Sequence, residues 1–286
     1  MTSRGEELFK AAKHLQEKKS LFGKTKNLQE ASDRYTQSAN AFKNERNFKR
    51  AGEAHLISAK VHQELKEFSA SASSAMEAAK CFTKSPDTYD QAVEAYKLAI
   101  SVYQEKKNDT MVADIKSEMA SLLFKQQKVD EAINLWNEAI NIYKETYNEP
   151  KAARHLEEIA DIISDTGRYS EAADLYIEAS KLRFKEALTQ TSAGPLFAKA
   201  ILCILDTGDT IGARVKLEDY LQENPAFRMH HMYKFVDELI DKIEGQNIEE
   251  FDDFIEKYKQ CTIVDNWTNN RILDMRRYAD SEEGIL

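Results

Sequence analysis

The most regular feature of the chain is a pattern of small and aromatic residues at helical spacing. Each copy begins with an Ala preceded by Glu or Gln, and an aromatic residue follows four positions later. The three copies read Ala92-Tyr96-Ala99-Tyr103, Ala132-Trp136-Ala139-Tyr143 and Ala172-Tyr176-Ala179, with their first alanines 40 residues apart. Steps of three and four residues place these side chains on one face of an α-helix.

This alternation predicts helices that stack on one another. Small residues let a neighbouring helix approach closely, the aromatic residues fill the space beside it, and each repeat needs the next to bury its face. The sequence predicts similar helix faces at Ala31-Tyr35-Ser38-Phe42, Ala51-His55-Ser58-His62, Ser71-Ala75-Ala78-Phe82 and Ala213-Leu217. We therefore predict an all-α fold, in which a tetratricopeptide-like (TPR-like) α-solenoid of antiparallel helix pairs occupies residues 28–222.

The two ends of the chain differ from this repeat. Residues 1–27 predict a helix over 6–19 and then a loop that exposes Leu21 and Phe22 among lysines. Beyond residue 222 the spacing of small and aromatic residues changes, so residues 223–286 are predicted to form a compact helical bundle with an acidic tail. A stripe of Trp267, Ile272, Leu273 and Met275 is expected to pack the last helix against this bundle, with residues 282–286 projecting into solvent.

Composition supports a helical protein with a large surface. The chain of 286 residues has only 9 Gly and 4 Pro, too few for the many turns of a large β protein. Its 31% of charged residues suits a structure with much surface relative to its core. The net charge of −9 argues against nucleic-acid binding. No run approaches the roughly 18 apolar residues of a membrane span, and residues 1–4 lead directly into polar helix, so we expect a soluble, cytoplasmic protein.

Catalytic and metal-binding motifs are absent from the sequence. Neither dinucleotide-binding and phosphate-binding glycine loops nor the HExxH and GxSxG motifs occur, so we predict no enzyme activity and no cofactor. The cysteines Cys81, Cys203 and Cys261 are odd in number and widely spaced, which favours reduced thiols in the core. The carboxylate pairs Glu157-Glu158 and Asp252-Asp253 are expected to be solvated helix faces.

Three further stretches of sequence are informative through their order and spacing, which extend over nearly the whole chain. The first runs from Leu21-Phe22-Gly23 through Glu30-Ala31-Ser32-Asp33-Arg34-Tyr35 and Ala41-Phe42-Lys43 to Arg50-Ala51-Gly52, the second is Pro225-Ala226-Phe227, and the third runs from Val264-Asp265-Asn266-Trp267 to Glu282-Glu283-Gly284-Ile285-Leu286. In these stretches the chain resembles the soluble NSF attachment protein (SNAP) family, in its alpha-SNAP/Sec17-like branch.

The resemblance implies an adaptor that binds assembled SNARE complexes and recruits the NSF-type hexameric ATPase, which then pulls the SNARE bundle apart. It implies three surfaces, with peripheral membrane contact through Leu21 and Phe22 and SNARE contact through a basic face. The acidic end with its terminal aliphatic residues would bind the ATPase, through Glu282, Glu283, Ile285 and Leu286. No catalytic residue, metal or cofactor is implied.

The SNARE face is where this sequence departs from the family. Of its usual basic residues one is matched by Arg154, with Lys151 on the same helix. The other expected cationic places hold Asn108, Asp114, Glu158 and Gly194, and Lys116 and Lys199 are nearby candidates for compensation. The alternative function is a generic TPR-type peptide-binding scaffold, although such repeats are nearer 34 residues long than 40.

Overall fold

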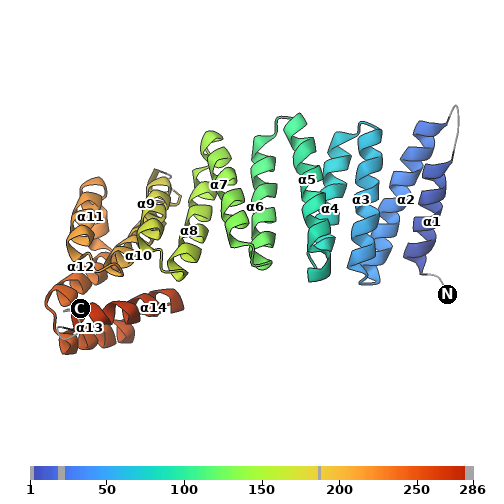
Figure 1. The fold of residues 1–286 in the computed structure, drawn as a ribbon. Helices are drawn as coiled ribbons and strands as arrows, with labels where there is room; N and C mark the ends of the chain where they lie inside the picture. Colours follow the sequence, from blue (N-terminus) through green and yellow to red (C-terminus); the bar gives the residue numbers. More distant parts are fainter. Residues whose placement is uncertain (1–2, 19–22, 186–187, 281–286) are drawn as a thin grey trace. The chain divides into compact units, whose positions relative to one another are not determined.

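Every regular element in the described part of the chain is a helix, as Figure 1 shows. The computed structural model describes residues 3–18, 23–185 and 188–280. The elements are α1 (Arg4–Glu17), α2 (Lys24–Asn44), α3 (Phe48–Glu64), α4 (Phe68–Phe82), η1 (Pro86–Thr88), α5 (Tyr89–Glu105), α6 (Asp109–Lys125), α7 (Val129–Glu145), α8 (Glu149–Asp165), α9 (Tyr169–Lys185), η2 (Gln190–Ser192), α10 (Ala193–Leu205), α11 (Thr210–Glu223), η3 (Pro225–Met229), α12 (His231–Glu244), α13 (Ile248–Cys261), α14 (Asn266–Met275) and η4 (Arg276–Ala279). The predicted all-α class is confirmed. The chain divides into two compact units, residues 1–142 and 143–286, with α7 running across the division.

Most of the turns between repeat helices share one backbone design. The second residue after the helix has positive φ, and the residue that follows it donates its backbone N–H to the carbonyl five residues earlier, as Asn47 does to Phe42. Asn47 then begins the next helix by accepting the Arg50 N–H with its side chain. Among the described residues, six with positive φ are not glycine. This conformation costs about 1 kcal/mol for each of them, and its use explains how the chain turns so often with few glycines. The six residues are Arg46, Lys66, Lys107, Gln127, Tyr147 and Gln246.

The predicted faces of small and large residues form the core of the first unit. Ala92 and Ala132 are fully buried, and Tyr96 and Trp136 are 3% exposed. The earlier faces on α2 and α4 are buried at every predicted position. His62 and Tyr103 are only partly buried, and His62 Nδ1 lies 2.7 Å from the carboxylate of Glu67, the residue before α4. Apart from these two positions, the predicted burial of these faces is confirmed.

Two glycines mark where helices of this unit touch most closely. A Cβ atom at Gly52 would lie 2.6 Å from the ring of Phe82, so α3 and α4 could not approach as they do with any other residue there. A Cβ atom at Gly5 would lie 2.5 Å from the ring of Phe42, and the Gly5 carbonyl accepts a hydrogen bond from Ser38. Helix α1 thus packs along α2 in the way that repeat helices pack on one another.

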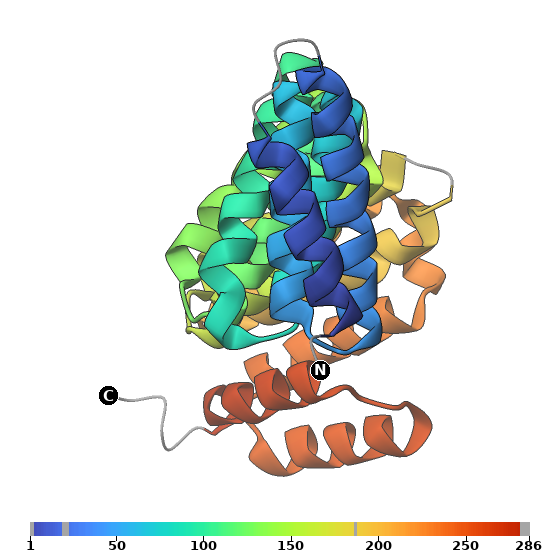
Figure 2. The same cartoon turned by 90° about the vertical axis from the view of Figure 1, so that its right-hand side faces the viewer.

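The second unit continues the helix pairs and adds a different arrangement. Helices α8, α9 and α10 pack successively as antiparallel neighbours, while α13 and α14 lie side by side and crosswise to them (Figures 1 and 2). One hydrophobic core joins α10 to α11, α12, α13 and α14. It includes Leu202, Leu217, Leu239, Phe251 and Met275.

The last helix packs differently from the prediction. Trp267 donates from its indole nitrogen to Ser164 Oγ at 2.8 Å and meets the Tyr176 ring edge-on, so it attaches α14 to the repeat helices α8 and α9 as well as to the C-terminal core. Ile272 and Met275 are buried as expected. Leu273 is 56% exposed, which corrects its place in the stripe, because consecutive helical residues point about 100° apart and Ile272 takes the inward direction.

Two further expectations about polarity are wrong. Cys81 and Cys203 are buried thiols, but Cys261 is exposed at the end of α13, where the helix leaves the core. Glu157 is not a solvated carboxylate, because it pairs with Arg183 and Lys199 in a half-buried position. None of the helices in the described ranges combines the length and apolar content that a bilayer-spanning segment needs.

Candidate functional site

The exposed cationic feature that the sequence predicted lies on α8. Lys151 and Arg154 are three residues apart in the first two turns of this helix, so their side chains project to the same side. The Arg154 side chain is 58% exposed. Lys151 lies with its Nζ atom 5.5 Å from the centre of the Tyr143 ring, which stacks on the ring of His155. The pair is thus positioned by an aromatic platform from the end of α7.

Arg154 is held by its neighbours on the same helix. Its guanidinium lies 3.6 Å from the Glu158 carboxylate and 3.1 Å from His155 Nε2, while His155 Nδ1 lies 2.7 Å from Glu158. Burial alone would raise the pKa of Glu158, but the hydrogen bond with His155 and the charges of His155 and Arg154 lower it overall. Glu158 therefore remains a carboxylate that orients Arg154 and offsets part of its charge.

Lys199 lies on α10 at the centre of a cluster that ties four helices together. Its Nζ atom is 2.9 Å from Asp161 and 3.5 Å from Glu157, both on α8, and it lies over the rings of Tyr176 and Trp267. The side chain is only 20% exposed. Two charge partners and two rings suit a lysine that joins α8, α9, α10 and α14. The sequence contains no signal for this cluster, since its members are far apart along the chain.

Lys116 is likewise compensated. It lies on α6 in the first unit, its side chain is 17% exposed, and its Nζ atom forms an ion pair with Glu138 of α7. Of the four predicted SNARE-contacting residues, the structure brings Lys151 and Arg154 together on one helix face and connects Lys199 to the same helix through Glu157 and Asp161.

Three of the places that depart from the family's basic pattern have structural roles in this chain. Asn108 caps α6 by accepting the Met111 N–H, and Glu158 hydrogen-bonds His155 as described. A Cβ atom at Gly194 would lie 2.7 Å from the Phe227 ring, so this position accepts no side chain while Phe227 is packed there. Asp114, at the fourth such place, is partly buried on α6.

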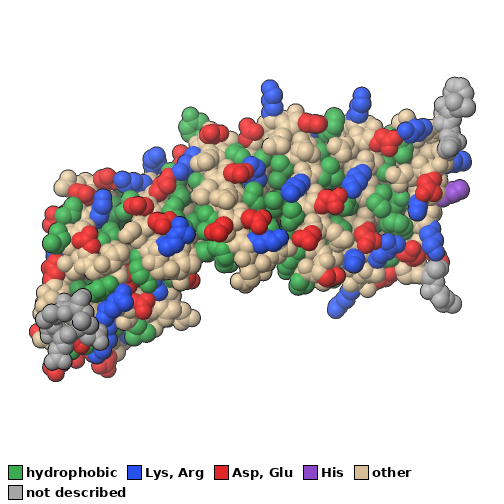
Figure 3. Space-filling model, in the orientation of Figure 1, with side chains coloured by type: hydrophobic (Ala, Val, Ile, Leu, Met, Phe, Trp, Pro, Cys, Tyr) green, Lys and Arg blue, Asp and Glu red, His purple; other side chains and the backbone are tan. Residues whose placement is uncertain are grey.

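The surface charge is finely mixed on the face of the molecule that Figure 3 shows. In the space-filling view, lysines and arginines alternate with aspartates and glutamates, and no broad patch of one sign covers the visible face (Figure 3). Several lysines pair with a glutamate 34 residues ahead, on the second helix along the chain. These pairs are Lys43–Glu77, Lys60–Glu94 and Lys144–Glu178. A partner that binds by charge would have to compete with a glutamate for each of these three lysines.

The two other predicted surfaces lie outside the described residues. Leu21 and Phe22 fall between α1 and α2, where the flanking Lys13 and Lys24 are well exposed. Glu282, Glu283, Ile285 and Leu286 follow η4, whose Ala279 is fully buried. Within the described ranges, no three His, Cys, Asp or Glu residues are grouped so as to hold a metal ion.

Comparison with known proteins adds a family relationship to this geometry. The model of the family described as "Soluble NSF attachment protein, SNAP" matches residues 3–278. A probable vesicular-fusion protein sec17 homolog of Neurospora crassa is 27% identical over 268 residues, covering 92% of this chain and 91% of that protein. The beta-soluble NSF attachment protein of Bos taurus is 26% identical over 258 residues, covering 90% and 86%. The alpha-soluble NSF attachment protein of Homo sapiens is 24% identical over 267 residues, covering 93% and 90%.

Solved structures support the fold. A signal transduction ATPase from Pyrococcus horikoshii with a tetratricopeptide repeat sensor superposes with a TM-score of 0.54 at 15% identity. The match covers 89% of this chain and 41% of that one. Such low identity carries information about architecture alone, and the architecture is the predicted TPR-like array of helices.

Proposed function

We propose, because this chain belongs to the soluble NSF attachment protein family, that it is a non-enzymatic adaptor in vesicle fusion. It would bind assembled SNARE complexes and recruit an NSF-type hexameric ATPase, which supplies the energy for SNARE disassembly. The family match over residues 3–278, together with a relative that is named for vesicular fusion and matches over 91% of its length, carries this proposal. The adaptor would work in the cytoplasm and associate with membranes peripherally.

SNARE binding is assigned first to Lys151 and Arg154. Arg154 is the more exposed of the predicted cations, and its guanidinium can form paired hydrogen bonds with a carboxylate. Lys199 and Lys116 would contribute less directly, because a new acidic partner must compete with Glu157, Asp161 and Glu138 for their charges. Individual exposed ion pairs contribute only about 0.2 to 1 kcal/mol, so binding must sum many contacts along the helices.

Charge reversal at Arg154 tests this surface. Arg154→Glu should weaken SNARE binding, and the remaining affinity should depend less steeply on salt concentration, because fewer opposite charges meet across the interface. Arg168→Glu is the matched control, since Arg168 is 51% exposed in the turn after the same helix and also pairs with a nearby glutamate. Equal loss in both variants would indicate a general charge effect, and unchanged binding of Arg154→Glu would assign the contact to another face.

Membrane contact is assigned to Leu21 and Phe22. Burying each side chain contributes on the order of 2 kcal/mol, and about 4 kcal/mol in total corresponds to roughly millimolar affinity. Lysines such as Lys24 and Lys26 add about 1 kcal/mol each against anionic lipid. This contact would therefore assist an adaptor that a membrane-anchored SNARE complex already holds.

ATPase binding is assigned to the acidic tail. Glu282 and Glu283 would meet a basic surface of the ATPase, and Leu286 would fill an apolar pocket there. Loss of about 2 kcal/mol from Leu286→Ala corresponds to a roughly thirtyfold loss of affinity. The variant should keep SNARE binding and lose ATPase stimulation, whereas full stimulation would exclude this role of the tail.

A reconstituted disassembly reaction tests the function as a whole. Immobilised SNARE complex is incubated with this protein and the ATPase, and SNARE release is measured with ATP and with a non-hydrolysable analogue. An adaptor of this family gives ATP-dependent release that requires all three components. A generic peptide-binding scaffold would give none, and the proposal would then fail.

A further inference from the structure

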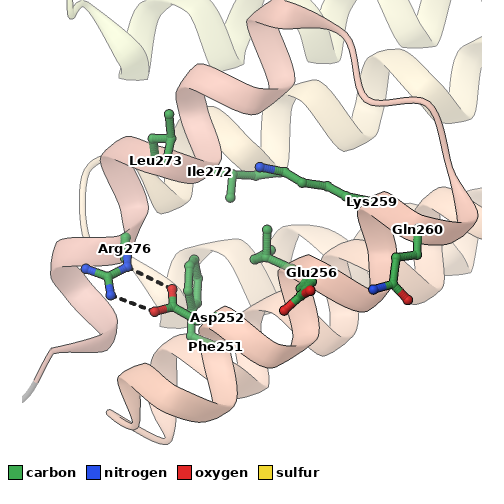
Figure 4. Close-up of a pocket in the computed structure, with 9 residues that line it drawn as sticks. Phe251, Asp252, Glu256, Lys259, Gln260, Ile272, Leu273 and Arg276 are labelled. Carbon is green, nitrogen blue, oxygen red and sulfur yellow. Dashed lines mark hydrogen bonds and ion pairs between the residues drawn. The ribbon is translucent and has the colours of Figure 1, made fainter.

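Helices α13 and α14 leave an apolar groove between them that no described residue fills. The groove has a volume of about 460 Å³, and its floor is made by Phe251, Ile255 and Ile272. These three side chains belong to the core and are at most 7% exposed. Leu273 lines the same groove with 56% of its surface exposed, so it adds apolar area that an occupant of the groove could cover (Figure 4).

The rim of the groove is charged. Arg276 closes one end through two hydrogen bonds to Asp252, of 2.8 and 2.6 Å. Lys259 extends from α13 toward Ile272 on α14 (Figure 4), and no carboxylate of the described residues lies within ion-pair distance of it. Glu256 also lines the groove, one turn before Lys259. An occupant with aliphatic side chains and a carboxylate beside Lys259 would therefore complement both the floor and this lysine.

The chain itself carries such a segment next to the groove. Beyond Asp280 the sequence continues Ser-Glu-Glu-Gly-Ile-Leu. The point of departure is fixed, because the Tyr278 hydroxyl donates to the Asp206 carbonyl at 2.9 Å and Ala279 is fully buried. The path from Asp280 back along η4 and one turn of α14 to Ile272 is about 14 Å, and five extended residues span about 17 Å. The segment is thus long enough to reach the groove floor.

We propose that residues 281–286 dock into the groove between α13 and α14, with Ile285 and Leu286 on its apolar floor and Glu282 or Glu283 against Lys259. Docking is an alternative to the predicted tail that projects into solvent, which stays a prediction because residues 281–286 lie outside the described ranges. Two aliphatic side chains give roughly millimolar affinity, and a short tether supplies a millimolar effective concentration. Docked and released tails are then comparably populated.

The consequence rests on the function proposed above. If the ATPase binds Glu282 and Leu286, a docked tail hides those residues and the ATPase must compete with the groove. Since about half of the molecules hold the tail released, docking weakens ATPase binding only about twofold. This groove would therefore keep the free adaptor from engaging the ATPase fully without blocking it.

Disulfide trapping in the full-length chain tests the docking without the ATPase. In a Cys261→Ser background, Gly284→Cys is combined with Gln260→Cys in the groove, and the rate of intramolecular cross-linking under a mild oxidant is measured by peptide mass spectrometry. Gly284→Cys with Asp253→Cys, an exposed position of α13 outside the groove, is the control for random collision. Cross-linking to the groove should be about tenfold faster than to the control. Leu273→Cys is a second trap that leaves α13 unaltered.

Charge reversal separates specific docking from mere proximity. Lys259→Glu should slow trapping at Gln260→Cys severalfold, while Lys257→Glu, an exposed lysine on the same helix that does not line the groove, should not. Equal trapping at the groove and control positions would overturn the docking. Cross-links between two molecules instead of within one would also overturn it, and would name a second copy as the occupant.

A final measurement separates docking from the role of the tail. The cross-linked protein should stimulate the ATPase at least about tenfold less than the same protein after reduction, because the tail can no longer leave the groove. Full stimulation by the cross-linked form would overturn the regulatory consequence and the ATPase-binding role of the tail, while the docked tail itself would stand on the trapping rates.

Discussion

The carboxyl group of Asp206 gives the sharpest test of how the second unit holds α14. Asp206 ends α10 with its side chain fully buried, and Arg271 of α14 lies 3.5 Å away. Burial raises the pKa of Asp206 to about 7, and the charge of Arg271 opposes this shift without reversing it. Asp274, the second partner of Arg271, adds to the rise. The carboxylate form is therefore costly at this site, even beside an arginine.

The sign of the pH dependence follows from this shift. An unfolded aspartate has a pKa near 3.9, so between about pH 4 and pH 7 the folded chain holds a proton that the unfolded chain has lost. The contribution of Asp206 to the free energy of unfolding is fully present below about pH 4 and is lost as the pH rises through about 7. From pH 5 to pH 8 the loss amounts to between about 2 and 3 kcal/mol.

Asp206→Asn removes the titrating proton while keeping the shape of the side chain. Urea unfolding of the parent and the variant, followed by circular dichroism from pH 5 to pH 8, should show the variant gaining about 2 kcal/mol relative to the parent as the pH rises. Subtracting the two curves cancels the opposite effect of carboxyls whose pKa is lowered, such as Glu158. Asp253→Asn, which removes an exposed carboxylate, should follow the parent. Parallel curves for Asp206→Asn and the parent would refute the reasoning.

Three further sets of substitutions probe the buried repeat face, the glycine that stands where the family has a basic residue, and the predicted membrane loop. Ala132→Leu should overpack a fully buried contact and lower the free energy of unfolding by about 1 to 3 kcal/mol, and an unchanged urea midpoint would contradict the assignment of this face. Gly194→Lys, which restores a basic residue, should cost at least about 1 kcal/mol in the same assay, because its Cβ atom would displace the Phe227 ring. Leu21→Ser with Phe22→Ser should leave thermal unfolding unchanged and slow disassembly of membrane-embedded SNARE complexes more than of soluble ones. Equal effects on the two substrates would remove the membrane role.

Local spacing was enough to predict the helices and the faces they bury. Positions such as Ala92, Tyr96 and Ala99 are three or four residues apart, and a helix places such positions on one face whatever surrounds it. The pairing of Lys151 with Arg154 was predictable for the same reason. Positive φ at Lys66 or Tyr147 was not, because those residues resist that conformation and only the packing of the flanking helices imposes it.

Contacts between distant parts of the chain decided the rest. Ser164 and Trp267 are 103 positions apart in the sequence, and nothing between them signals that the two would share a hydrogen bond. Lys199 contacts Asp161 only when α8 and α10 are packed together. Whether Leu273 or Ile272 faces inward depends on the direction in which α14 crosses the repeat helices. The sequence by itself thus determined the helices, the apolar faces that they bury and the family. Tertiary structure decided which charges remain available and where a groove is left open, because ion pairs and cavities depend on distances in space rather than along the chain.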